Sequence, residues 1–216
     1  MTGHPQAVAV CPHPPMLVPE VASGAADDLA ELRAACDAAV AGLIAQAPGR
    51  IVVLGTGELA ADLDETAGGT FAPYGVDLHV GGPGAQLPLS LAVGAWLLDR
   101  AGWAGPRTYS TGVPDVDGAA LLVMADGSAK RSSTAPGFLD DRAEEHDTRI
   151  AAALAAGDAD ALAGLDPQLG VELWAAGVPA LRTLGELTKG ADIVARLRVD
   201  MAPFGVGYWV ADWVLS

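Results

Sequence analysis

The stretch from Val8 to Glu20, VAVCPHPPMLVPE, constrains the fold more than any other part of the chain. A short apolar run that begins at Ala7 predicts a buried strand. Four prolines follow between residues 12 and 19. Because proline has no amide hydrogen and also restricts the residue before it, neither a helix nor a sheet ladder can continue there. The chain must therefore leave the sheet in an extended loop at the carboxyl end of this strand.

His13 stands in this proline loop and is the first candidate site residue. In open α/β sheets, ligands bind at the carboxyl ends of the strands. An imidazole held between prolines also loses little backbone entropy when it engages a metal or a substrate. The alternative is a histidine that only hydrogen-bonds to nearby backbone in a proline turn, because P-H-P-P is not a general metal motif. The local sequence leaves both interpretations open.

A second buried strand is predicted at Ile51–Leu54, and the loop Gly55-Thr56-Gly57-Glu58 follows it. We expect this loop to lie beside the His13 loop, so that Pro14, Thr56 and Gly57 line a common pocket. The glycine pair could admit a ligand close to the backbone. However, G-x-G alone lacks the third glycine and the following helix of a dinucleotide fingerprint, which argues against a nicotinamide or flavin cofactor.

A third polar loop follows the strand predicted at residues 119–124. It contains Asp126 and Ser128, which could orient a substrate hydroxyl or a water molecule. Asp-Gly is also an ordinary turn signal, so a purely structural turn is the alternative. If all three loops meet at the carboxyl edge of one sheet, they line a single crevice.

The remaining sequence alternates between helical and strand patterns, as is typical of an α/β protein. Helices are predicted from about residue 25 to Pro48, at 87–101 and, in several pieces, at 139–188; further strands are predicted at 76–80, 107–111, 196–200 and 206–213. We interpret His146-Asp147 as a polar helix end rather than a site pair. Trp209 and Trp213 are either core residues or the contact of a homodimer.

Composition narrows the function classes. A net charge of −15 makes nucleic acid an improbable partner, since phosphate binding needs clustered Lys and Arg. No apolar run is long enough to span a bilayer, and the amino terminus lacks an export signal, so we expect no membrane partner and a cytoplasmic location.

Two cysteines, Cys11 and Cys36, cannot build a disulfide framework or a cysteine-rich zinc site. Cys36 falls on an apolar helix face and is predicted to be core.

Four stretches, in the same order along the chain, resemble the LigB-type class III extradiol ring-cleavage dioxygenases and their Memo-like relatives. They are Cys11–Pro15 with Pro19-Glu20, Leu122–Ser128, Asp147–Gly164 and Ala202–Tyr208. The resemblance covers nearly the whole chain. It implies a single LigB-like domain over residues 1–216 with a three-layer α/β/α fold around a central, mostly parallel or mixed sheet.

In active members of that family, two His and one Glu hold a ferrous ion, which leaves open positions for a catecholate and dioxygen. The resemblance places His13 at the first ligand position. The second His falls on Thr56, the acid–base His on Ala129, and the Glu on Ala175, three residues from Glu172. Glu58 is a further carboxylate that could complete the set, so the candidate Fe(II) ligands are His13, Glu58 and Glu172.

These departures favour a LigB-like domain with an incomplete iron site that binds a small molecule or a protein without catalysis. The first alternative is an Fe(II)-dependent extradiol dioxygenase that cleaves a catechol-type ring, with His13, Asp126 and Ser128 as its catalytic residues. A hydrolase or transferase in the same pocket is the second alternative, and the chain has no G-x-S-x-G nucleophile elbow to support it.

Overall fold

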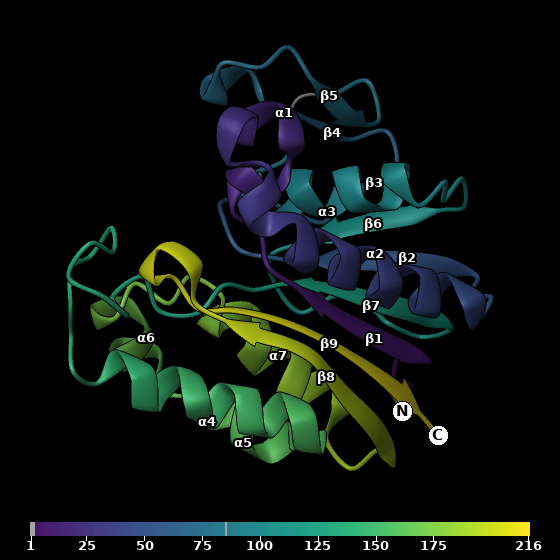
Figure 1. The fold of residues 1–216 in the computed structure, drawn as a ribbon. Coiled ribbons are helices and arrows are strands. Elements are labelled where there is room, and N and C mark those ends of the chain that lie inside the picture. Colours follow the sequence, from purple (N-terminus) through teal and green to yellow (C-terminus); the bar gives the residue numbers. More distant parts are fainter. Residues whose placement is uncertain (1–2, 85) are drawn as a thin grey trace.

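A computed structural model describes residues 3–84 and 86–216. Its centre is a seven-stranded mixed sheet with the strand order β3-β6-β2-β7-β1-β9-β8 (Figure 1). The four strands β1, β2, β6 and β7 are parallel, and β3, β9 and β8 join them antiparallel at the two sides. The bounds are β1 Ala7–Cys11, β2 Arg50–Leu54, β3 Leu63–Asp64, β6 Arg107–Ser110, β7 Ala119–Met124, β8 Ile193–Met201 and β9 Tyr208–Leu215.

Helices cover both faces of this sheet (Figure 1), which confirms the predicted three-layer α/β class. One face carries α2 (Ala30–Ala45) and α3 (Leu89–Arg100), and the other carries α4 (Ala143–Ala156), α5 (Ala159–Ala163), α6 (Pro167–Glu172) and α7 (Val178–Thr188). The short helix α1 (Pro19–Ala22) follows the proline loop, and β4 (Gly68–Thr70) pairs with β5 (His79–Gly81) in a small separate sheet.

The side chains of the strands form two separate hydrophobic cores, one on each face of the sheet, because successive residues of a strand point to opposite faces. In β1, Ala9 and Cys11 join the core under α2 and α3, whereas Val8 and Val10 join the core under α4, α5 and α7. All five residues of β1 are buried. A strand buried on both faces reads as a continuous apolar run, which is why β1, β2 and β7 were predictable from the sequence.

Several predicted boundaries differ from the structure. The first long helix begins at Ala30 rather than near residue 25, because 3-10 turns at Ser23–Ala25 and Asp27–Leu29 precede it. The strand predicted at 76–80 is reduced to β5 at His79–Gly81. Trp209 and Trp213 are fully buried, and the Trp213 Nε1–H donates to the Leu154 carbonyl at 2.8 Å. They are core residues, so they no longer support a dimer contact.

Helices of membrane-crossing length and apolarity are absent from residues 3–84 and 86–216.

The close approach of α5 to α7 depends on a glycine. A Cβ at Gly185 would lie 2.4 Å from the Ala163 backbone nitrogen and 2.5 Å from the Ala159 carbonyl oxygen. Because backbone atoms cannot yield as a flexible side chain can, Gly185→Ala is expected to destabilise the fold by about 2 kcal/mol or more. The same change at Gly42 in α2, where a Cβ meets only the Arg198 guanidinium at 4.0 Å, should be neutral or stabilising by about 0.5–1 kcal/mol. Urea denaturation measures both, and equal effects would contradict this view of the α5–α7 contact.

Candidate functional site

The proline loop after β1 and the loop after β7 are joined at the carboxyl edge of the sheet. The His13 amide donates to the Asp126 Oδ1 at 2.7 Å, and the His13 Nδ1 lies 3.5 Å from the same oxygen. Just before these residues, the Ala125 amide donates to the Cys11 carbonyl at 2.9 Å and extends the β1–β7 ladder. The predicted convergence of His13 with Asp126 therefore matches the geometry of the described chain.

The pair is nearly enclosed: 8% of the His13 side chain and 14% of the Asp126 side chain are exposed. Burial raises the pKa of Asp126 above its ordinary value, and the charge and amide of His13 oppose that shift. Tyr208 forms a backbone bridge with Asp126, and burial together with the Asp126 charge raises the pKa of the Tyr208 hydroxyl. A carboxylate, an imidazole and a phenol thus share this edge of the sheet.

Asp126 is also held from the helical layer that contains α7. The Gly177 amide, at the start of α7, donates to the Asp126 carbonyl at 2.9 Å. A Cβ at Gly177 would lie 2.5 Å from that carbonyl oxygen, so only glycine permits this approach. The backbone of Asp126 is consequently held by β9 and the start of α7, and its side chain is held by the His13 amide.

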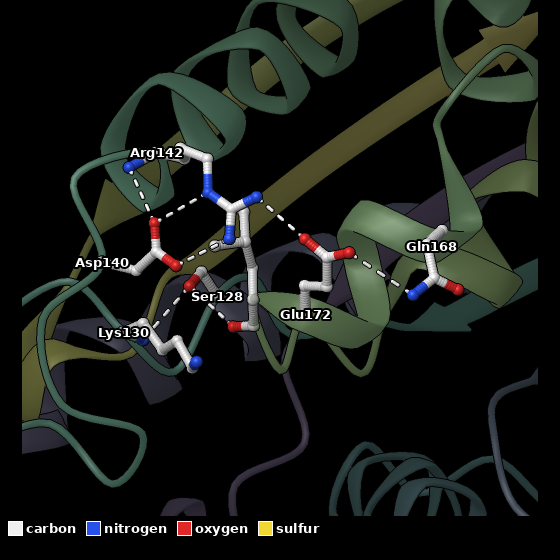
Figure 2. A network of polar contacts seen from close by, with 7 residues as sticks. Ser128, Lys130, Asp140, Arg142, Gln168 and Glu172 are labelled. Carbon is white, nitrogen blue, oxygen red and sulfur yellow. Dashed lines mark hydrogen bonds and ion pairs between the residues drawn. The ribbon is translucent and has the colours of Figure 1, made fainter.

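Ser128 lies in the same loop but is committed to holding it. Its side chain is fully buried, its Oγ–H donates to the Leu173 carbonyl at 2.8 Å, and its oxygen accepts the Lys130 amide at 3.1 Å (Figure 2). A hydroxyl with these two partners and no exposed surface has a structural role. Although the sequence predicts Ser128 as a catalytic residue, its hydroxyl is already engaged by Leu173 and Lys130 within the described chain.

Asp147 is the polar residue that the sequence interpretation missed. It is 1% exposed, its Oδ1 accepts the Ser128 amide at 2.9 Å, and its Oδ2 lies 3.3 Å from the Arg131 guanidinium. Gly127 and Gly207 pack directly against the carboxylate and leave no room for larger side chains. His146 and Asp147 lie near the start of α4, as the interpretation as a polar helix end expects, and both side chains are buried there.

Glu172, a predicted metal ligand, ends α6 and belongs to a different network (Figure 2). Its Oε2 accepts from the Arg142 guanidinium at 2.8 Å, and its Oε1 lies 3.4 Å from the Gln168 amide nitrogen. Arg142 also pairs with Asp140 at 2.9 Å. Arg142 and Gln168 lower the pKa of Glu172, so this carboxylate is already neutralised by a protein cation.

The loop after β2 contacts β6 and the start of α3, and its Gly55 amide donates to the Ser110 carbonyl at 3.0 Å. The Thr56 amide donates to the Ser90 Oγ at 2.9 Å, and the Ser90 hydroxyl donates to the Thr56 carbonyl at 2.6 Å. Gly57 has a φ of +132° and packs on the Pro88 ring, and Glu58 is exposed. Since β7 lies between β1 and β2, the strands that lead into this loop and into the His13 loop are not adjacent in the sheet. The common pocket of Pro14, Thr56 and Gly57 stays a prediction.

Pro14, the remaining predicted pocket residue, is buried beside His13, and its carbonyl accepts the Leu17 amide at 2.9 Å. It closes the turn that carries His13.

Within residues 3–84 and 86–216, no three His, Cys, Asp or Glu side chains gather in a metal-binding group. What the edge offers instead is a buried imidazole whose Nδ1 lies 3.5 Å from a carboxylate and has no hydrogen-bond partner among the described residues. Such a pair can accept or donate a proton, or hold a ligand by a hydrogen bond from the ring.

No model of a known protein family matches this chain, and no curated protein matches it either.

Because burial raises the pKa of Asp147 to about 6 from an ordinary value of 3.8, the folded state holds a proton there that the unfolded chain has lost. The unfolding free energy contributed by this group therefore decreases as the pH rises from roughly 4 to 6. Asp147→Asn removes that titration and can still accept the Ser128 amide. We expect the stability of Asp147→Asn relative to the unsubstituted protein to increase over this range and to level off above it.

Urea denaturation at a series of pH values measures this difference. Asp141→Asn, at an exposed position before α4, controls for the loss of one negative charge. A pH-independent difference between Asp147→Asn and the unsubstituted protein would contradict the assignment.

Proposed function

We propose that this chain is a LigB-like domain that binds a small molecule at the carboxyl edge of its sheet and does not perform extradiol ring cleavage. The His13–Asp126 pair is the observation that carries the proposal. A small-molecule partner also suits the net charge of −15, which disfavours nucleic acid. The proposal includes a cytoplasmic location, with which two free, buried cysteines are compatible.

The pair gives His13 a defined role toward a ligand. A carboxylate beside Nδ1 favours the tautomer that carries its proton on Nδ1, and the opposite ring nitrogen, Nε2, is then a hydrogen-bond acceptor. The present 3.5 Å separation from Asp126 is long for a hydrogen bond, and such contacts often tighten when a ligand binds. We assign the ligand a hydroxyl group that donates to the His13 Nε2.

The donor chemistry at this edge does not fit a resident ferrous ion. A facial iron site needs two imidazoles and a carboxylate. Of the three predicted ligands, His13 lies beside Asp126, Glu172 is paired with Arg142, and Glu58 is an exposed residue of the loop after β2. One imidazole and one carboxylate would hold ferrous iron weakly.

Catechol and phenol serve as probes, because both carry a donating hydroxyl. We expect either compound to shift the ring resonances of His13 in a nuclear magnetic resonance titration. Replacing Asp126 by Ala removes the group that orients the ring and should weaken binding roughly tenfold. His79→Ala is the matched control, because His79 is exposed on β5 and pairs only with Asp77 among the described residues.

An anaerobic ferrous titration followed by oxygen uptake on catechol separates this proposal from the dioxygenase alternative. We expect neither stoichiometric iron nor oxygen consumption. Iron bound at one equivalent together with oxygen uptake, both lost in His13→Ala and retained in His79→Ala, would instead establish the extradiol enzyme.

A further inference from the structure

A groove of about 600 Å³ runs between α4 and the α5–α6 segment. This volume lies in the range of small-molecule sites in proteins. Small apolar side chains form its walls, and four polar residues lie among them. The lining residues are His146, Arg149, Ala152, Ala153, Ala156, Asp158, Ala161, Gly164, Leu165, Asp166 and Leu169. Neither His13 nor Asp126 contributes to it, so the groove is separate from the edge described above.

His146 is a buried imidazole without a full set of partners. The residue is 6% exposed, and its Nε2 has no hydrogen-bond partner among residues 3–84 and 86–216. Burial lowers the pKa of His146, the charge of Arg149 lowers it further, and the charge of Asp166 opposes them. The ring is therefore neutral near pH 7 and can accept a hydrogen bond. A buried nitrogen without a partner is destabilising, so a donor that reached the His146 Nε2 would stabilise this position.

The charges that line the groove are predominantly negative. Asp158 and Asp166 cap α5 and α6: the Asp158 Oδ1 accepts the Ala161 amide at 2.9 Å, and the Asp166 Oδ1 accepts the Gln168 amide at 2.8 Å. Neither carboxylate forms an ion pair with any residue of the described chain. The cation of the lining, Arg149, is paired with Glu145 one turn earlier on α4. An anion entering the groove would meet two carboxylates and an already paired guanidinium.

We propose that this groove binds an aliphatic amine, with the ammonium group between Asp166 and the His146 imidazole and the alkyl chain along the alanine wall of α4. An ammonium has three donors and no acceptor, which matches a carboxylate and a neutral imidazole. Ala152, Ala153 and Ala156 offer an apolar surface without polar groups that would remain unpaired. The chain's net charge of −15 also concentrates cations near its surface.

Isothermal titration calorimetry with three probes of equal length tests this inference: n-pentylamine, pentan-1-ol and pentanoate. We expect the amine to bind more tightly than the alcohol and pentanoate not to bind. Asp166→Asn keeps a side-chain oxygen for the α6 cap while it removes the charge, so it should weaken amine binding roughly tenfold and leave the alcohol unchanged.

A steric pair of variants locates the site. Ala152→Leu fills the groove from an exposed position on α4 and should abolish amine binding, whereas Ala155→Leu, exposed on the same helix outside the lining, should not. The absence of amine binding to the unsubstituted protein, tighter binding of pentanoate than of the amine, or amine binding that survives in Ala152→Leu would each overturn the inference. Thermal unfolding of both variants verifies that they are folded.

Discussion

The hydrogen bond from the His13 amide to the Asp126 carboxylate is the contact on which the carboxyl edge of the sheet depends. It joins a loop that prolines exclude from the sheet to the loop after the neighbouring strand β7. A hydrogen bond to a charged acceptor in a nearly enclosed position is strong, and its loss destabilises the fold. Because the Asp126 backbone also contacts Gly177 before α7 and Tyr208 at the start of β9, this one residue connects the proline loop to α7 and β9.

A second buried carboxylate stabilises the same loop from the other face. Asp147 accepts the Ser128 amide and lies against Gly127 and Gly207, so the chain around residue 128 is held between α4 and the segment before β9. The two aspartates have different surroundings: Asp126 faces an imidazole, and Asp147 faces the Arg131 guanidinium. We therefore propose that the His13–Asp126 pair binds the ligand and that the Arg131–Asp147 pair stabilises the loop.

The local sequence pattern predicted those strands that are buried along their whole length. Continuous apolar runs specified β1, β2 and β7, and proline and glycine placed the end of α2 and the breaks between α4 and α7. The convergence of His13 with Asp126 followed from parallel strands that end at one edge. The local sequence pattern does not reveal the tertiary environment of a residue. In sequence, Asp147 is typical of a solvated residue early in a helix. It is a buried acceptor because Gly127 and Gly207, which are remote in sequence, pack against it. Strand order likewise depends on pairing across the chain, so the position of β7 between β1 and β2 was missed.

Amide hydrogen exchange at His13 tests most directly whether the two loops are joined as described. We predict that this amide is protected although it lies in a loop outside the sheet, and that Asp126→Ala reduces its protection roughly tenfold while the Val10 amide within β1 exchanges as before. An unprotected His13 amide in the unsubstituted protein, or protection that does not change in Asp126→Ala, would contradict the account.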